Sequence, residues 1–232
     1  NYNRDVEIFP VLNTIFEKIY GESPYKSPTD MGVNMAGNCI CDDEACREAS
    51  KQEIIRRYFD ALNALAKGST SEKEAQKIEL LMNMAGITVT DRKVVIKALE
   101  RAKETDGPAA ALELRDGRII TGKTTNLLGA SAALLLNVLK VLAGIDHETH
   151  IISPESIEPI QKLKVDYLKS KNPRLHTDEV LIALSARLAL SQLPELAGCQ
   201  AHTSVMLSDV DIKIFKKLEV QLTSEAVYEH AL

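Results

Sequence analysis

The sequence predicts a mixed α and β protein, in which an N-terminal helical subdomain is followed by an α/β subdomain. Two observations lead to this prediction. Apolar residues recur at helical spacing up to about residue 106, and beyond the Asp106-Gly107-Pro108 break they alternate with polar residues, as in a strand. We therefore expect residues 1–106 to be helical and residues 107–232 to form a small mixed sheet covered by helices.

Four helices are expected in the first part, each with an apolar stripe and a recognisable start or stop signal. The first begins near Pro10, because proline suits a first helical turn, and Asp42 or Asp43 caps the second. Ser71 begins the third as part of a capping box. Residues 22–41 contain prolines and glycines without helical periodicity, so we expect a long loop there, of the kind that often carries function. The four expected helices cover about 10–20, 43–67, 72–85 and 91–102.

The second part is expected to contain a hairpin, a buried helix and a parallel pair of strands. Asp116-Gly117 is a type I′ turn signal between two strand-like segments. The helix over residues 128–143 is apolar nearly all round and should therefore be buried. A short helix that begins at Ser208 connects the last two strands. Because strands connected by a helical crossover are parallel, we expect this pair to be parallel. The expected strands are 110–114, 119–123, 202–207 and 219–223, and two further helices are expected over 159–168 and 178–192.

Composition and charge exclude several partners. The 232 residues are 45% hydrophobic, and 28 Lys and Arg stand against 33 Asp and Glu, which gives a net charge of −5. We therefore expect no bulk attraction to nucleic acid or to an anionic membrane. No apolar run approaches the roughly 18–20 residues of a membrane span. Three of the four cysteines lie within eight residues, a poor layout for disulfides, so we expect free thiols and a cytoplasmic protein.

Residues 117–124 (GRIITGKT) match the phosphate-loop pattern letter for letter. Such a loop has to lie between a strand and a helix, whereas the β-branched residues here indicate that the motif is itself a strand. No nucleotide-hydrolysing site is therefore expected. Lys123 and Thr124 nevertheless precede the buried helix, and the free N–H groups of a helix N-terminus can hold an anion.

A second candidate lies in the lysine-rich stretch 162–176. Arg174 follows a proline, and its planar guanidinium suits a phosphate or a carboxylate. Asn172 can add an amide donor, and His176 titrates near neutral pH. The alternatives are a solvated helix face for the lysines and a capped turn for His176.

The glycine-punctuated segment 27–37 is the third candidate, with Thr29, Asp30 and Asn34 as ligand-binding residues. The alternative is an aspartate that caps a turn. His202 is a further candidate on a predicted strand, where the alternative is a partly buried ring with satisfied hydrogen bonds. No metal site is expected, because neither the cysteines nor the HETH motif at 147–150 has the spacing of zinc ligands.

Several ordered segments, from Asn1 to the end of the chain, resemble one bacterial family, catalogued as domain of unknown function family 1846. They are NYNRDVEIFPVLN, SPTDMGVNMAG, EASKQEIIRRYF, KIELLMN, GRIITGKT, KSKNPRLHTDEVLIALS and AHTSVMLSDVD. Members of that family are about twice as long and carry a phosphate-loop-like motif in their front half. The resemblance implies that this chain is the C-terminal half, with a helical subdomain followed by a three-layer α/β subdomain like that of cytidine deaminases. It implies no reaction and no catalytic residue.

Together these observations predict that the chain contributes to a nucleotide- or phosphometabolite-binding cleft, completed by an absent N-terminal half. The alternative is a non-catalytic assembly module. Whether the protein is an enzyme, and with which cofactor, stays open. A homo-oligomer is expected, because the apolar helix over residues 128–143 needs cover on every side.

Overall fold

The computed structural model describes residues 2–25, 27–35, 42–184 and 188–228. The chain forms two compact units, Asn1–Arg92 and Lys93–Leu232, which are described separately below. The sequence pattern had suggested a boundary near residue 106. The structure places helix α5 (Lys93–Thr105) in the second unit, because this helix packs against strand β1 (Ala109–Glu113).

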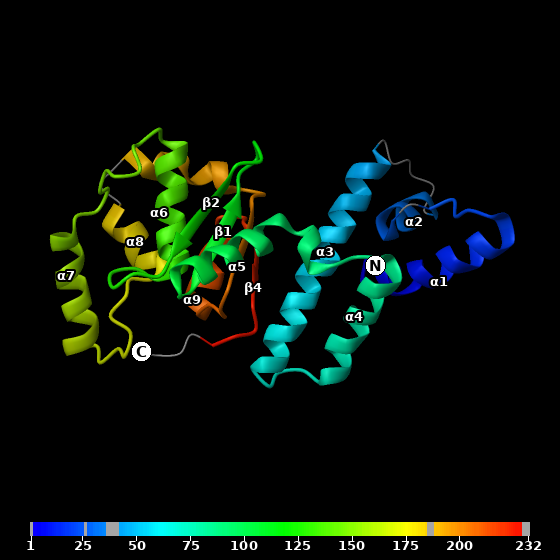
Figure 1. Ribbon diagram of the computed structural model, residues 1–232, viewed down its shortest axis with the longest axis horizontal. Helices are drawn as coiled ribbons and strands as arrows, with labels where there is room; N and C mark the ends of the chain where they lie inside the picture. The colour runs from blue at the N-terminus through cyan, green and yellow to red at the C-terminus, as the bar shows by residue number, and fades with distance from the viewer. Residues whose placement is uncertain (1, 26, 36–41, 185–187, 229–232) are drawn as a thin grey trace. The chain divides into compact units, whose positions relative to one another are not determined.

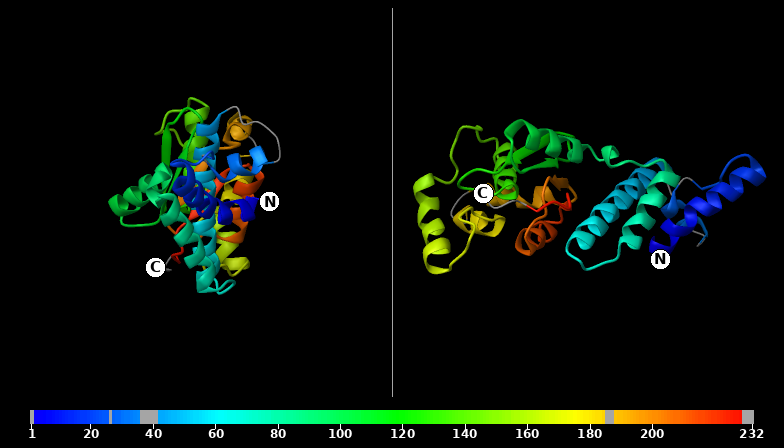
Figure 2. Two further views of the ribbon diagram at one scale, coloured as in Figure 1. Left: turned by 90° about the vertical axis from the view of Figure 1, so that its right-hand side faces the viewer. Right: turned by 60° about the horizontal axis from the view of Figure 1, so that its bottom comes forward.

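The described residues of the first unit form helices and connecting segments without a strand, as predicted. It contains α1 (Tyr2–Tyr20), α2 (Pro28–Met35), α3 (Asp43–Ala66) and α4 (Glu72–Ala85). The helices α3 and α4 lie side by side, as both views in Figure 2 show. The predicted cap of α3 is present, since a carboxylate oxygen of Asp42 accepts a hydrogen bond from the Ala45 N–H at 2.9 Å.

Three local predictions for this unit were wrong. Helix α1 begins at Tyr2, because Ile8 and Phe9 extend its apolar face upstream and Pro10 lies inside the helix. The predicted loop contains α2, whose first turn is capped where the Ser27 hydroxyl accepts from the Asp30 N–H at 3.0 Å. At α4, Ser71 makes no side-chain cap, so the predicted capping box is absent.

The second unit is built on a four-stranded mixed sheet in the order β2-β1-β3-β4. Its other strands are β2 (Ile119–Lys123), β3 (Gln200–Thr203) and β4 (Gln221–Ser224). Strand β1 pairs antiparallel with both β2 and β3, while β3 and β4 are parallel and connected through α9 (Asp209–Lys217). The hairpin and the parallel pair are therefore confirmed (Figure 1).

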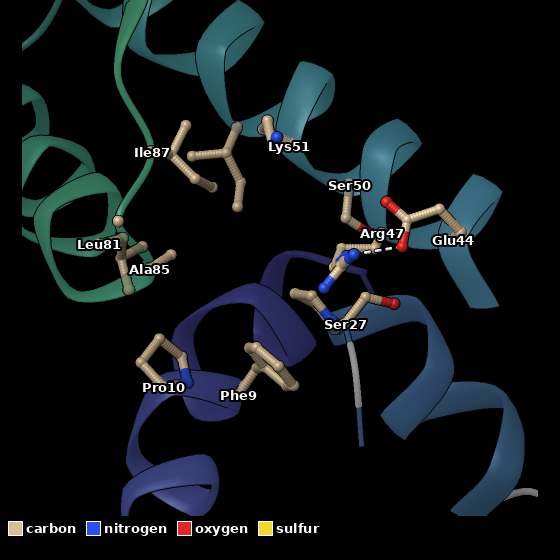
Figure 3. Close-up of a pocket in the computed structure, with 13 residues that line it drawn as sticks. Phe9, Pro10, Ser27, Glu44, Arg47, Ser50, Lys51, Leu81, Ala85 and Ile87 are labelled. Carbon is tan, nitrogen blue, oxygen red and sulfur yellow. Dashed lines mark hydrogen bonds and ion pairs between the residues drawn. The ribbon is translucent and has the colours of Figure 1, made fainter. Parts of the chain in front are cut away.

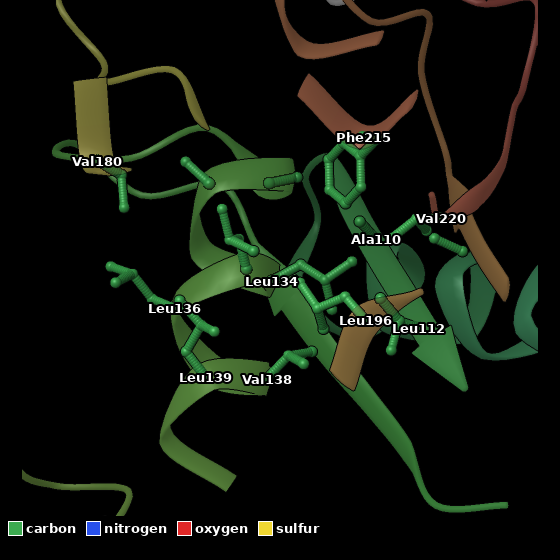
Figure 4. Close-up of a cluster of buried hydrophobic side chains, with 14 of the residues drawn as sticks. Ala110, Leu112, Leu134, Leu136, Val138, Leu139, Val180, Leu196, Phe215 and Val220 are labelled. Atoms are coloured by element: carbon green, nitrogen blue, oxygen red, sulfur yellow. The ribbon is translucent and has the colours of Figure 1, made fainter. Parts of the chain in front are cut away.

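Helices cover both faces of this sheet. On one face, Val94 and Ala98 of α5 pack against Ala111. On the other face, α6 (Ala130–Leu142) lies over Ala110 and Leu112, in the apolar cluster that Figure 4 shows. The alanines of β1 thus lie between two helical layers.

Helix α6 is buried within its own unit. Nine of its residues from Ala130 to Leu139 are buried, against the sheet and the neighbouring helical segments. The prediction of burial is confirmed, but the cover comes from the same chain. The physical reason given for a homo-oligomer therefore falls away, and self-association stays a prediction.

Gly122 of β2 sets the distance between the sheet and α6. A Cβ atom at this position would lie 2.2 Å from the Leu134 backbone nitrogen and 2.5 Å from the Leu134 Cα. The second glycine of the phosphate-loop-like motif is thus needed for helix packing, and the motif is a strand, as the sequence analysis had expected.

The remaining helices differ from their predicted bounds. Helix α7 (Pro154–Lys162) begins earlier, with proline at its start, and continues into a π-helical turn over Leu163–Tyr167. Helix α8 (Thr177–Leu184) is shorter than predicted and is followed, after undescribed residues, by a 3₁₀ segment over Leu188–Leu196. In the described residues, no helix combines the length and apolarity needed to cross a membrane.

Candidate functional site

A cavity of about 710 Å³ lies along strand β2 in the second unit. It is lined by residues of α5, β2 and α6 and by the segments on either side of α6. Among the described residues that line it, every charged or titratable side chain is basic: Arg101, Lys123, Lys140, His147 and His150. A basic cavity is notable in a chain whose net charge is −5.

The basic groups reach this cavity from three elements. Lys123 is the last residue of β2, and Lys140 on α6 donates from Nζ to the His147 carbonyl oxygen at 2.7 Å. Arg101 on α5 donates from Nη1 to Glu104 at 3.1 Å, while its buried Nε has no hydrogen-bond partner among the described residues. An anion in the cavity would therefore meet several N–H donors that are already held in place.

Much of the cavity wall is apolar. Six aliphatic side chains line it: Leu127, Leu128, Leu136, Ile151, Ile152 and Ile157. Asn137 lies among the lining residues, and its side-chain amide nitrogen donates to the Thr121 carbonyl oxygen at 2.9 Å. The cavity thus suits a ligand that has an anionic end and an apolar body.

Thr124 follows Lys123 at the end of β2. Its backbone N–H donates to the Pro108 carbonyl oxygen, whereas its hydroxyl oxygen is buried without a hydrogen-bond partner in the described part of the chain. Buried hydroxyl groups are normally hydrogen-bonded, so this orphaned oxygen marks a place where a polar ligand atom or a water would fit. Of the predicted residues, Lys123 lines the cavity, whereas Thr124, the next residue along the chain, is not among the lining residues.

A second polar cluster joins the N-terminal ends of α8 and α9. Its centre is the buried Asp211, whose Oδ1 accepts from the Thr177 hydroxyl at 2.6 Å and from the Thr177 N–H at 3.1 Å. Its Oδ2 accepts from the Ser208 hydroxyl at 2.7 Å and lies 3.1 Å from His176 Nδ1. His176 is therefore held by a helix cap and lies outside the lining of the β2 cavity.

His176 and Asp211, the two titratable groups that meet in this cluster, shift each other's pKa. Burial by itself raises the pKa of Asp211, but hydrogen bonds from His176, Thr177 and Ser208 outweigh burial and lower that pKa to about 2. The hydrogen bond to Asp211 raises the pKa of His176 above its usual value of 6.5. The folded state thus favours a charged His176–Asp211 pair.

We expect this pair to make stability fall as the pH rises past neutrality. The raised pKa of His176 means that its contribution is fully present below about 6.5 and is lost as the pH rises through the folded-state value. Urea unfolding at about pH 6 and about pH 8.5 should show a larger drop in the wild type than in His176→Gln. His147→Gln, at an exposed position, is the control, and equal drops in all three proteins would contradict the prediction.

Asn172, Lys164 and the backbone of Arg174 form a hydrogen-bonded turn in the lysine-rich stretch. The Asn172 side-chain oxygen accepts from the Arg174 N–H at 3.0 Å, and the Arg174 carbonyl oxygen accepts from the buried Lys164 at 2.6 Å. The Nζ of Lys164 also contacts Glu179 at 2.8 Å. Asn172 therefore shapes the turn, and the structure does not place it or Arg174 in the lining of the β2 cavity.

The remaining predicted residues lie elsewhere. Thr29 and Asp30 belong to α2 of the first unit, where the Thr29 hydroxyl lies 3.1 Å from that of Ser50. Asn34 is also in α2, but its side chain is outside the described ones. His202 is fully buried in the sheet, with Nδ1 2.8 Å from the Thr223 hydroxyl and Nε2 3.3 Å from Glu225. His202 thus lies outside the lining of the β2 cavity, and its ligand-binding role stays a prediction.

Sequence reasoning missed four residues of the β2 cavity, namely Arg101, Lys140, His147 and His150. The HETH motif had been considered only as a zinc site, and a loop cluster was the favoured interpretation. The missed signal was that basic residues flank the segment formed by the β1–β2 hairpin and α6. Arg101 precedes this segment, and Lys140, His147 and His150 lie at its end or follow it. In the described residues, no three His, Cys, Asp or Glu side chains gather closely enough to hold a metal ion.

The two units define a class of protein in which a helical part precedes a mixed sheet with helices on both faces. Residues 1–86 match the family described as Domain of unknown function DUF1846, N-terminal, and residues 90–232 match its C-terminal counterpart. The chain belongs to this DUF1846 family. The expectation of a C-terminal half alone is thereby corrected, because the chain contains residues that match both domain descriptions.

Curated relatives agree with this assignment. The chain is 57% identical to a UPF0371 protein of Corynebacterium urealyticum and 58% identical to one of Corynebacterium aurimucosum, over 98% of the chain in each case. It is 51% identical, over 99% of the chain, to a UPF0371 protein of Streptococcus thermophilus. The chain spans about half the length of these relatives, 48%, 47% and 48% respectively.

Proposed function

We propose that this protein binds a phosphate-bearing small molecule, a nucleotide or a phosphorylated metabolite, in the cavity along β2. The observation that carries the proposal is the lining: all charged and titratable side chains among its described residues are basic. Phosphate groups are recognised by such convergent N–H donors, and Lys123 supplies the most direct one.

The apolar wall favours an organic phosphate over the free ion. Inorganic phosphate would leave the aliphatic side chains of the cavity in contact with water. A nucleoside or another organic body would cover them and would gain the free energy of apolar burial. The cavity is formed by the α/β unit by itself, so the proposal does not call on a missing half.

We extend the proposal to the relationship of the α/β unit with other proteins and to the cellular location of the protein. The strand order β2-β1-β3-β4, with helices on both faces, supports kinship of the α/β unit with cytidine deaminases. The zinc-ligand spacing of those enzymes is missing from the sequence, so we propose no deamination. The unpaired thiols of Cys46 and Cys199 support a cytoplasmic location.

Calorimetric titration with adenosine 5′-monophosphate and with inorganic phosphate tests the proposal. We expect the nucleotide to bind more tightly than phosphate, and Lys123→Gln to weaken nucleotide binding by roughly tenfold, the value of one charge-assisted hydrogen bond. Lys97→Gln is the matched control, because Lys97 is an exposed lysine of α5 that pairs with Glu100 at 2.7 Å and does not line the cavity.

Two results would contradict the proposal. One is the absence of binding by either phosphate compound, and the other is an equal effect of the Lys123 and Lys97 substitutions. Binding through the basic side chains should also weaken as salt is added, because added ions screen these charges.

A further inference from the structure

The helical unit contains a second hollow, of about 280 Å³, which the proposed function does not use. It is lined by residues of α1, α3 and the C-terminal end of α4, and by the residues that begin α2. Figure 3 shows that its two ends differ in character. Ser27, Arg47 and Ser50 gather at one end, and Pro10 and Leu81 lie toward the other.

The polar end contains two buried hydroxyl groups. Ser27 is 1% exposed and Ser50 is 3% exposed. The Ser27 oxygen accepts from the Asp30 N–H at 3.0 Å, which leaves the hydroxyl proton of Ser27 to donate. Ser50 and Thr29 share one hydrogen bond of 3.1 Å, so one of these two hydroxyls also keeps a proton to donate.

Arg47 lies beside these hydroxyls, and Lys51 lines the hollow closer to Ile87 (Figure 3). Arg47 contacts Glu44 through Nη2, so the rest of its guanidinium fork can bind another acceptor. Lys51 lies 3.3 Å from Glu48. Both ion pairs involve exposed or half-exposed side chains, and such pairs are weak, so a ligand can compete with them. The polar end thus presents donors and calls for a group that only accepts.

Charge and shape together select the class of ligand. Arg47 and Lys51 stand against Glu44 among the charged lining residues, and Glu48 pairs with Lys51 from outside the lining, so the hollow has little net charge and suits at most a monoanion. A doubly charged phosphate would bring an excess negative charge into a hollow that is otherwise apolar. The apolar part of the lining comprises Phe9, Pro10, Ile54, Leu81 and Ile87, of which Phe9 lies close to Ser27 (Figure 3).

We propose that this hollow binds a small carboxylate with an apolar tail, such as a medium-chain fatty acid. The carboxylate accepts hydrogen bonds from Arg47, Ser27 and the Ser50–Thr29 pair. The tail lies against the apolar side chains of α1, α3 and α4, where its burial supplies the hydrophobic contribution to binding.

Calorimetric titration with octanoate tests this proposal. We expect Arg47→Gln to weaken octanoate binding by roughly tenfold, since a charge-assisted hydrogen bond is lost. Arg56→Gln is the matched control and should leave binding unchanged. Arg56 lies on the same helix and pairs with a nearby glutamate, Glu53, at 2.6 Å, but it does not line the hollow.

Octan-1-ol and inorganic phosphate separate the two parts of the ligand. Octanol has the tail without the charge, and phosphate has charge without the tail, so both should bind more weakly than octanoate. The proposal is overturned if octanoate does not bind, if octanol binds equally well, or if the Arg47 and Arg56 variants behave alike. Lys123→Gln should leave octanoate binding intact, so failure here is distinct from failure of the phosphate proposal.

Discussion

Gly122→Ala is expected to destabilise the α/β unit by about 3 kcal/mol, at the upper end of what overpacking usually costs. The new methyl group would overlap the backbone of α6, with its Cβ 2.2 Å from Leu134 N and 2.9 Å from the Ala130 carbonyl oxygen. Backbone atoms cannot rotate away as a flexible side chain can. Helix α6 would have to move off the sheet, and the apolar contacts of its buried face would loosen with it.

Denaturant unfolding of Gly122→Ala measures this cost. Gly107→Ala is a suitable control, because a Cβ there would lie in ordinary contact, 3.8 Å from the Thr105 carbonyl oxygen. The control should change the free energy of unfolding by less than about 1 kcal/mol. A Gly122→Ala protein as stable as the control would mean that α6 does not pack on β2 as closely as described.

Asp211→Ala is expected to cost a similar amount, about 3 kcal/mol, which is typical of breaking a buried hydrogen-bonded charge network. The substitution leaves the Thr177 N–H and the Thr177 and Ser208 hydroxyls without their acceptor. It also removes the carboxylate whose hydrogen bond raises the pKa of His176. The N-terminus of α8 loses its cap, whereas Ser208 still caps α9 through the backbone N–H at position 211 and loses only the acceptor of its own hydroxyl proton.

Asp209→Ala provides the comparison for Asp211. Asp209 lies in the same first turn of α9 but is exposed, and an exposed acidic residue there interacts favourably with the helix dipole, by about 0.3–1 kcal/mol. Thermal or urea unfolding of both variants would therefore distinguish the stability that a buried cap contributes from the stability that a surface charge contributes. The NMR-measured pKa of His176 should also fall in Asp211→Ala and stay raised in Asp209→Ala. Equal losses of stability in the two variants would disprove the role of Asp211.

Local signals in the sequence were sufficient for much of the fold. Asp116-Gly117 located the β1–β2 hairpin, and Ser208 located the start of α9, where its hydroxyl accepts from the Asp211 N–H at 3.2 Å. Pro10 misled the prediction for α1, because a proline inside a helix is rare enough to be interpreted as a start. The cap at Ser27 was visible in the sequence, but the prolines and glycines around it suggested a loop.

The candidate site was harder to predict, because its residues meet only through tertiary packing. Lys123 was found from its motif, but Arg101 and His150 come to the same cavity from elements on opposite sides of β2 in the sequence. The partner of His176 lies 35 residues further along the chain. No spacing rule connects such residues, and only the packing of α5, α6 and α9 on the sheet determines which of them become neighbours.

The order of pairing in the sheet has a consequence for how the chain folds. Strand β1 meets β2 through a tight turn, but it meets β3 only after a long excursion, with the Ala109 N–H bonded to Ser204 across 95 residues. Closing a loop of that length costs conformational entropy before the contacts between β1 and β3 can form. We therefore expect the hairpin and α6 to form a folding nucleus early. Until β3 docks, the alanine-rich edge of β1 stays open to pairing with other chains. On the ribosome, β3 is synthesised well after β1, so this interval is the time in which a nascent chain needs protection from aggregation.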